Sequence, residues 1–312
     1  MEWYYIVLIV LIALIILVLL TSLVCFFMTF YSNRHAKKDE IFLPEGEEYL
    51  KYRPTIVKDI EDARKMNYVE MSIKSFDGLT LKGRYYELEK GLPMEIMMHG
   101  YRGTGERDLS TGIKRAHICN RNALVIDQRA SGHSEGHVIT FGIKESKDCL
   151  SWINHCIEYF GKDIKILITG ISMGAATVMN ASAYDLPSNV VGILADCGYD
   201  SAKNIIIKTI KEMKLPPKIF YPFVKLGARI YGGFNLEEIS PLEAMKKCKL
   251  PIIFMHGTKD SIVPAYMSKN VYDLCQSTKR LVYIEGSDHG IAYLVDPEKY
   301  VSELEDFFSY TK

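Results

Sequence analysis

One short stretch of this chain carries residue types and spacing suited to nucleophilic chemistry. An apolar run that begins at Lys165 ends in Gly170-Ile171-Ser172-Met173-Gly174 and continues in small, helix-forming residues. The pattern is typical of a strand, a sharp turn and a helix, in which the two glycines leave the serine hydroxyl unobstructed. Met173 would open the helix with an unpaired backbone N–H, aimed where negative charge develops when a serine attacks a carbonyl. The same five residues also suit a plain turn between a buried strand and a helix.

Polar side chains follow the other short apolar runs as well. They are His99-Gly100-Tyr101 after 95–98, Asp127 to Gly136 after 123–126, Asp196 after 190–195, Asp260 after 252–255 and His289 after 281–284. In parallel sheets the chemistry gathers at the carboxyl ends of strands, so these side chains are expected to meet. Ser172, Asp260 and His289 stand in the order of one known catalytic triad. Asp196 is the alternative acid, whereas His99 or His256 as the base would break that order.

The elements that must position these residues alternate between strands and helices. Residues 68–73 and 80–87 alternate apolar and polar side chains around Asp77-Gly78, which predicts a β-hairpin. The later apolar runs are separated by segments long enough for helices, such as 142–160 and 173–184, and 57–66 suits a short helix. We therefore predict an α/β fold: a mostly parallel sheet of about eight strands with helices on both faces.

Taken together, these motifs resemble the α/β-hydrolase family from about Tyr68 to the C-terminus. The nearest likeness is to serine aminopeptidase and acylglycerol-lipase-like serine hydrolases that carry an N-terminal membrane anchor. The matching motifs are His99-Gly100-Tyr101, Asp127-x-Arg129-x-x-Gly132-x-Ser134, Gly170 to Gly174, Gly257-x-x-Asp260-x-x-Val263-Pro264 and Asp288-His289-Gly290. Ala130 departs from the family pattern, since many members carry glycine there.

The resemblance implies a role for each catalytic residue. Ser172 would be the nucleophile, His289 the base and Asp260 the residue that orients the imidazole, while the backbone N–H groups of Tyr101 and Met173 would form the oxyanion hole. The family inserts a lid at about 200–240, where this chain is rich in aromatic residues. Phe220, Tyr221 and Phe223 are candidate substrate-binding residues of that lid, and they equally suit an ordinary helix buried on the sheet.

The N-terminal segment predicts a membrane anchor. Residues 3–31 contain no charged side chain, and about 20 apolar residues suffice to span a bilayer. A cleaved signal peptide fits less well, because no basic segment precedes the run and no small-residue cleavage site follows it. We expect a polar tether at 32–53 and the hydrolase domain at 54–312. The cations Arg34, Lys37 and Lys38 follow the helix, which favours a single pass with a cytoplasmic catalytic domain.

The composition of the chain bears on its possible partners and cofactors. The 312 residues carry 38 basic and 38 acidic side chains, which gives no support for a nucleic-acid partner. Seven scattered cysteines without metal-ligand spacing suggest free thiols, and we expect neither a metal nor another cofactor. The predicted substrate is a small or lipid-like ester or thioester. A peptidase using the same triad and a non-catalytic, membrane-tethered binding module are the alternatives.

Overall fold

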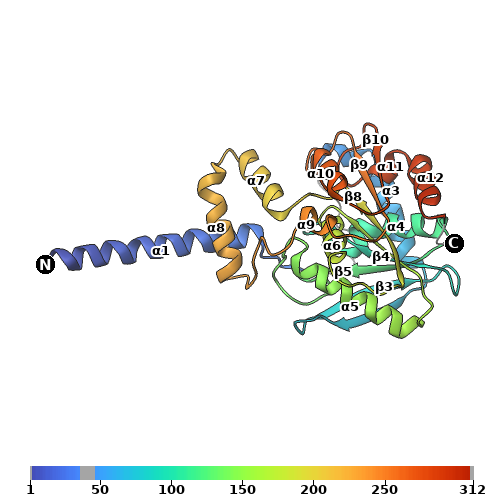
Figure 1. Ribbon diagram of the computed structural model, residues 1–312, viewed down its shortest axis with the longest axis horizontal. Helices are drawn as coiled ribbons and strands as arrows, with labels where there is room; N and C mark the ends of the chain where they lie inside the picture. The colour runs from blue at the N-terminus through green and yellow to red at the C-terminus, as the bar shows by residue number, and fades with distance from the viewer. Residues whose placement is uncertain (1, 36–45, 310–312) are drawn as a thin grey trace.

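The computed structural model describes residues 2–35 and 46–309. A long helix, α1 (Trp3–Thr29), projects from a layered α/β domain (Figure 1). Within the described chain, α1 is the one helix that is long and apolar enough to cross a membrane, with a mean hydropathy of 3.4 in its most apolar window. The helix predicted for residues 3–31 is therefore present, and it ends at Thr29.

An eight-stranded sheet forms the centre of the domain. Its strands are β2 (Val69–Lys74), β3 (Thr80–Tyr86), β4 (Met94–Met98), β5 (Asn122–Asp127), β7 (Ile166–Ile171), β8 (Val190–Asp196), β9 (Ile252–Gly257) and β10 (Lys279–Ile284). They follow the order β10-β9-β8-β7-β4-β5-β3-β2. Only β3 runs antiparallel to its neighbours β2 and β5. The predicted hairpin and the mostly parallel sheet are both confirmed, and the fully apolar run of β4 is buried along its whole length.

Helices cover both faces of the sheet. One face packs against α3 (Arg53–Lys65), α4 (Gly105–Ile118), α11 (Ala292–Val295) and α12 (Pro297–Phe307). The other packs against α5 (Ile143–Phe160), α6 (Met173–Ala181), α9 (Pro241–Met245) and α10 (Tyr266–Leu274). Along β4 the alternation of side chains separates the two layers, since Met97 belongs to the first face and Ile96 and Met98 to the second.

Two helices inserted after β8 stand away from the sheet. They are α7 (Ala202–Glu212) and α8 (Pro217–Ile230), and Figure 1 shows them beside the C-terminal part of α1. The apolar face of α8 packs into a cluster that contains Phe26 of α1 and Phe30, the residue that follows the helix, and both of these side chains are buried. The last three turns of α1 are therefore part of the protein's own packing.

The segment predicted as a polar tether, 32–53, contains regular structure at both of its described ends. β1 (Arg34–His35) pairs in parallel with β6 (Ser131–Gly132), and a short helix, α2, covers Glu47–Leu50. Lys37 and Lys38, two of the cations used to predict orientation, lie outside the described residues. The predicted domain boundaries stay a prediction.

Candidate active site

The turn between β7 and α6 holds Ser172 in a rare backbone conformation. β7 ends at Ile171 and α6 begins at Met173, so the predicted strand, sharp turn and helix are present. Ser172 itself has φ 56° and ψ −115°. A Cβ on Gly170 would overlap the backbone of Gly174, and a Cβ on Gly174 would overlap the carbonyl of Met98. Both glycines are therefore required for β4, β7 and α6 to pack this closely.

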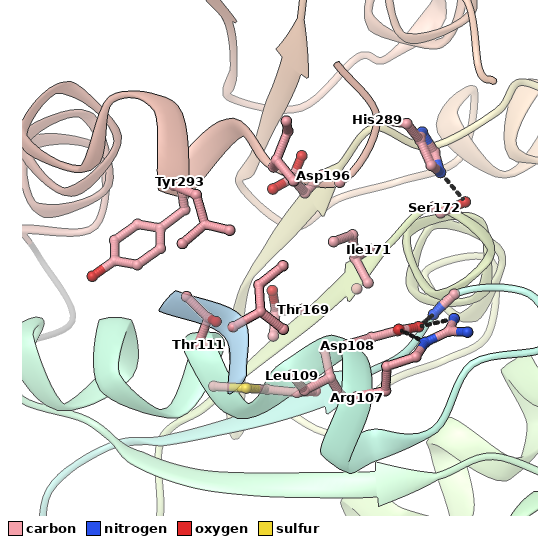
Figure 2. Close-up of a pocket in the computed structure, with 18 of the residues that line it drawn as sticks. Arg107, Asp108, Leu109, Thr111, Thr169, Ile171, Ser172, Asp196, His289 and Tyr293 are labelled. Carbon is pink, nitrogen blue, oxygen red and sulfur yellow. Dashed lines mark hydrogen bonds and ion pairs between the residues drawn. The ribbon is translucent and has the colours of Figure 1, made fainter. Parts of the chain in front are cut away.

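A chain of hydrogen bonds joins Ser172 to a histidine and an aspartate from two distant loops. The hydroxyl of Ser172 lies 2.9 Å from Nε2 of His289 (Figure 2). On the other side of the ring, Nδ1 of His289 lies 2.8 Å from Oδ2 of Asp260. With the proton on Nδ1, the ring donates to the carboxylate and accepts from the hydroxyl. This is the arrangement in which a histidine can remove a proton from serine.

Asp260 is kept ionised by the donors around it. Its Oδ1 accepts the backbone N–H groups of Ile262 and Val263 at 3.0 and 2.7 Å. Its Oδ2 lies 3.2 Å from Nε2 of the buried His256, in addition to the bond from His289. Burial by itself would raise the pKa of Asp260, but the hydrogen bonds from the two histidines outweigh it and lower the pKa to about 2. His256 also lies 2.8 Å from the carbonyl of Val263 through the same Nε2, so it packs against the loop that carries Asp260.

Asp196, the alternative acid, has different partners. Its Oδ2 accepts a 2.7 Å hydrogen bond from the hydroxyl of Tyr300, and no hydrogen bond joins it to His289 in the described structure. Its Oδ1 is buried, and the structure provides it with no hydrogen-bond partner. Burial raises the pKa of Asp196, and the bond from Tyr300 only partly offsets this effect. Of the two candidate acids, the structure brings only Asp260 to the imidazole.

The loop after β4 passes directly over the serine. A Cβ on Gly100 would lie 3.6 Å from Cβ of Ser172, so the backbone that leads to Tyr101 runs beside the hydroxyl. Oδ2 of Asp108 accepts the N–H of Gly100 at 3.0 Å and holds this loop. Met173 opens α6 on the other side of Ser172. The backbone that leads to Tyr101 and the start of α6 at Met173 therefore lie beside the serine, and the oxyanion hole itself stays a prediction.

The same loop is bonded to the end of α1. The hydroxyl of Tyr101 donates to the carbonyl of Thr29 at 2.7 Å. Nη2 of Arg102 donates to the carbonyl of Met28 at 2.8 Å, and Arg102 has a left-handed backbone with φ 52°. Carbonyls in the last turn of a helix lack intrahelical partners, so these two side chains satisfy groups that would otherwise need water. This contact between α1 and the loop after β4 could not be expected from the sequence.

A cavity of about 340 Å³ opens at Ser172 and extends between the sheet and the helices α4 and α11. Apolar side chains such as Met97, Leu109 and Ile171 form much of its lining. In Figure 2, Thr169 and Asp196 line the cavity between Ser172 and Tyr293. The cavity is therefore apolar with a polar portion, and its volume suits a small acyl group.

The aromatic residues predicted to wall the substrate pocket lie elsewhere. Phe220, Tyr221 and Phe223 are not among the residues that line the cavity. Tyr221 is buried in the cluster shared with α1 and donates a 2.7 Å hydrogen bond to Glu237, and Phe220 packs against the same cluster. These residues therefore do not wall the cavity at Ser172 in this structure, since α1 covers part of the face of α8 that carries them, and their substrate-binding role stays a prediction.

Comparisons with known proteins agree with this architecture. No family model matches the chain. The uncharacterized protein YqkD of Bacillus subtilis is 23% identical over 252 residues, which cover 79% of this chain and 81% of YqkD. The esterase Pf2001 of Pyrococcus furiosus superposes with a TM-score of 0.66 at 22% identity, covering 80% of this chain and 93% of the esterase. The α/β hydrolase GrgF of a Penicillium species superposes with a TM-score of 0.63 at 16% identity, covering 79% and 99%. This chain has the α/β-hydrolase fold.

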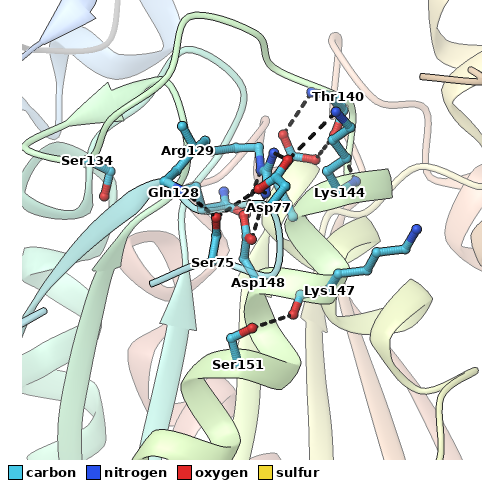
Figure 3. A network of polar contacts seen from close by, with 12 residues as sticks. Ser75, Asp77, Gln128, Arg129, Ser134, Thr140, Lys144, Lys147, Asp148 and Ser151 are labelled. Atoms are coloured by element: carbon cyan, nitrogen blue, oxygen red, sulfur yellow. Dashed lines mark hydrogen bonds and ion pairs between the residues drawn. The ribbon is translucent and has the colours of Figure 1, made fainter. Parts of the chain in front are cut away.

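Within the α/β-hydrolase fold, the motif around Asp127 and Arg129 supports the site from a distance. Arg129 forms paired hydrogen bonds of 2.7 Å with Asp148 of α5 and of 3.0 Å with Asp77 of the hairpin turn (Figure 3). Asp127 accepts the N–H groups of Gly105 and His133, both at 2.9 Å. These contacts tie the hairpin, α4 and α5 together, so the motif maintains loop geometry.

Two supporting residues of the α/β-hydrolase site carry no recognisable signal in the sequence. Asp108 holds the loop after β4 through Gly100, and Tyr49 of α2 donates a 2.9 Å hydrogen bond to the carbonyl of His289. Neither belongs to a motif, and Tyr49 lies 240 positions from its partner. Only the folded chain brings them to the loops that they hold.

Cys197 lies next to the hydrogen-bonded pair of Asp260 and His289. The three side chains place potential ligand atoms within 4.8 Å of one another. Burial raises the pKa of the Cys197 thiol well above its usual range, so the thiol stays protonated. Asp260 and His289 already bond to each other, and a protonated thiol is a poor metal ligand. The three residues therefore suit a hydrogen-bonded pair better than a metal site.

Proposed function

We propose that this protein is a serine hydrolase that cleaves an ester or thioester through an acyl-enzyme on Ser172. The observation that carries the proposal is the pair of hydrogen bonds that joins Ser172 to His289 and His289 to Asp260. The strained backbone of Ser172 supports it further, since strain of this kind is characteristic of functional residues. A non-catalytic binding module would need neither the strain nor the complete set of three residues.

The proposed reaction follows the geometry of the site. Oγ of Ser172 attacks the substrate carbonyl while Nε2 of His289 takes its proton, and Asp260 stabilises the resulting imidazolium. The backbone N–H groups of Tyr101 and Met173 stabilise the oxyanion, each contributing about 2.7 to 4 kcal/mol. His289 then protonates the departing alcohol or thiol as the carbonyl re-forms. Water, deprotonated by the same histidine, releases the acid and regenerates Ser172.

Labelling with a fluorophosphonate probe tests this proposal directly. We expect the purified full-length protein to react and Ser172→Ala to remain unlabelled, with a short-chain p-nitrophenyl ester hydrolysed only by the wild type. Ser182→Ala is a suitable control, because this serine lies at the far end of α6. Absence of labelling in the wild type, or equal labelling of Ser172→Ala, would refute the proposal.

The cavity supports a small acyl group as the part of the substrate that becomes bound to Ser172. A series of p-nitrophenyl esters should therefore show a preference for short to medium chains, because long chains exceed the enclosed volume. Since Phe220 packs outside the cavity, Phe220→Ala should leave this preference unchanged. Leu109 lines the cavity, so Leu109→Trp should fill part of it and shift the preference to shorter chains. Equal rates for all chain lengths would show that the cavity does not bind the acyl group.

A peptidase acting on substrates with a free amine is the second candidate. It is favoured by one observation: Asp196 lines the cavity and has a buried oxygen for which the described residues provide no partner. Such a carboxyl group could bind an ammonium group near the scissile carbonyl. Aminoacyl p-nitroanilides assayed beside the ester series discriminate the two, since a peptidase would prefer the anilides.

We further propose that α1 anchors the protein in a membrane with the catalytic domain in the cytoplasm. Phe30 is fully buried and Phe26 nearly so, and this packing supports a helix that is retained rather than removed as a signal peptide. The cations Arg34, Lys37 and Lys38 and seven free cysteines favour the cytoplasmic side. A reporter fused after Lys312 should be active only inside the cell. Activity of this reporter only on the outside would reverse the assigned topology.

A further inference from the structure

One face of α1 becomes buried towards its C-terminal end. From Trp3 to Leu20 most of its large apolar side chains are about half exposed. Ser22 and Phe26 are buried against the rest of the protein, whereas Val24, Phe27 and Met28 stay about half exposed. At 1.5 Å per residue, the distance from Trp3 to Ser22 is about 28 Å, close to the roughly 30 Å of a bilayer's hydrocarbon core. Lipid around the part of α1 that has no protein contact, from Trp3 to about Ser22, would place the edge of the hydrocarbon core that faces the catalytic domain near Ser22.

Helix α8 contacts α1 at that boundary. A Cβ on Gly227 would approach the carbonyl of Ser22 to 2.5 Å, so the two backbones are in close contact. The hydroxyl of Tyr231 donates to the carbonyl of Leu19 at 3.0 Å. Figure 1 shows α8 lying crosswise to α1. With α1 upright in a membrane, α8 therefore lies along the bilayer surface at the depth of the lipid headgroups.

The segment formed by α7, α8 and their connection is strongly basic. Residues 202–230 contain seven cations and a single acidic residue, Glu212, in a chain whose overall charge is zero; the cations are Lys203, Lys208, Lys211, Lys214, Lys218, Lys225 and Arg229. Lys203, Lys208 and Lys225 form ion pairs with glutamates. The other four are exposed and form no ion pair within the described structure. A concentration of unneutralised positive charge therefore lies near the boundary.

Exposed apolar side chains accompany these cations. Met213 and Ile219, at the connection between the two helices, are 48% and 56% exposed, and Ile230 is 49% exposed. On α8, Ile219, Phe223, Leu226 and Ile230 recur at intervals of three and four residues, which places them on one side of the helix. Apolar residues beside lysines are typical of helices that lie in the interface of an anionic membrane.

We propose that the surface formed by Lys211, Met213, Lys214, Lys218 and Ile219 binds the headgroups of anionic phospholipids. The lysines contact lipid phosphates while Met213 and Ile219 enter the region just below them. The inference rests on the proposed membrane anchoring by α1, and it adds a second, lipid-selective contact. Together the two contacts fix the tilt of the domain. Thr29 accepts the hydrogen bond from Tyr101 and lies only about 10 Å beyond Ser22 along the helix, so the loop beside Ser172 is close to the headgroups. The active site is thereby held within reach of ester groups near the headgroups.

A fluorescent probe at Met213 tests this contact in the full-length protein. Met213→Cys is labelled with a bimane dye and reconstituted into phosphatidylcholine vesicles with or without phosphatidylglycerol, each containing a nitroxide-headgroup lipid. The parent protein treated with the same dye gives the background from native cysteines. We expect several-fold stronger quenching with phosphatidylglycerol, and a loss of this excess at high salt, since salt screens exposed charges.

Charge reversal separates the proposed surface from a general charge effect. Combining Lys211→Glu, Lys214→Glu and Lys218→Glu should reduce quenching to the level seen in neutral vesicles. A control with the same change in charge, Lys90→Glu with Lys162→Glu and Lys249→Glu, alters exposed lysines on the sheet domain and should behave as the parent. Equal quenching in both lipids, or no response to the first triple variant, would overturn the proposal.

Two further measurements distinguish the possible failures. Flotation of the vesicles reports whether α1 is inserted, and hydrolysis of a soluble p-nitrophenyl ester reports the serine hydrolase independently of lipid. Protein that floats and hydrolyses the ester without lipid-dependent quenching would refute only the headgroup site. Protein that fails to float would refute the anchor and the headgroup site together, whatever its hydrolytic activity.

Discussion

The loops that carry Asp260 and Asp196 show how two similar carboxyl groups acquire opposite properties. Both follow strands at the same edge of the sheet, after β9 and at the end of β8, and both are buried. Asp260 is surrounded by two backbone N–H groups and two histidines, and its pKa falls to about 2. Asp196 has one donor, Tyr300, and burial raises its pKa. Burial raises the pKa of both carboxyl groups, and the donors outweigh this effect only at Asp260.

The largest expected difference concerns catalysis. Asp260→Asn should lower kcat by about 10⁴-fold, because the imidazole loses the carboxylate that orients it and stabilises its charge. Asp196→Asn should change kcat for a short ester only a few-fold, since this residue forms no hydrogen bond to His289. Steady-state kinetics of the two variants measure both effects. An equal loss in the two would show that Asp196 shares the role of the catalytic acid.

The two carboxyl groups should also differ in the pH dependence of stability. Because the pKa of Asp260 is lowered from its usual 3.8 to about 2, its ionised form contributes about 2 kcal/mol to folding. This contribution is complete above pH 4 and is lost as the pH falls from about 4 to about 2. Denaturant unfolding of the wild type and Asp260→Asn across this range should show a smaller pH dependence in the variant. The same pH dependence of stability in both proteins would contradict the lowered pKa of Asp260.

The sign is reversed for Asp196. A group whose pKa is raised in the folded state favours folding below its unfolded pKa of about 3.9, and this advantage is lost as the pH rises through the raised value. Asp196→Asn removes this ionisation, so the variant should gain stability relative to wild type as the pH is raised from acid to neutral. Thermal unfolding of the wild type and the variant at a series of pH values measures this difference in stability. A relative gain on acidification would mean that Asp196 is held as an anion.

Removal of the one hydrogen-bond donor that the described residues provide to the Asp196 side chain is the smallest change. Tyr300→Phe should cost about 1 kcal/mol in unfolding free energy, the usual value of one hydrogen bond, and should leave kcat nearly unchanged. Because the bond from Tyr300 lowers the pKa of Asp196, its loss should also move the transition described above to higher pH. An unchanged transition in the variant would mean that the bond does not affect this carboxyl group.

Residues that carry the proposed chemistry were the easiest to predict from the sequence. Ser172, Asp260 and His289 each belong to a short local pattern at the end of an apolar run, and the shared edge of a parallel sheet brings such ends together. Strands β7 and β9 are buried almost throughout, so continuous apolar runs located them well. The choice between Asp196 and Asp260 required the structure, because it depends on which neighbouring groups donate hydrogen bonds.

The packing of amphipathic helices was not predictable in the same way. The aromatic residues of α8 indicate an apolar face, but the pattern does not reveal whether substrate, the sheet or another helix covers it. Here Phe26 of α1 and the adjoining Phe30 do so, from a segment whose composition predicted contact with lipid along its entire length. Apolar periodicity identifies a face that must be covered, and the partner is determined by tertiary structure.

The bonds from Tyr101 and Arg102 to the last turn of α1 limit how this protein can be divided or recombined. Single-pass anchors are commonly exchanged for one another or removed to obtain a soluble domain. A junction placed after Tyr31 would here leave an open groove lined by Phe141 and Phe234, both of which contact the ring of Phe30. A junction before Leu19 would retain every contact described. The part of α1 that can be exchanged is thus shorter than the helix itself.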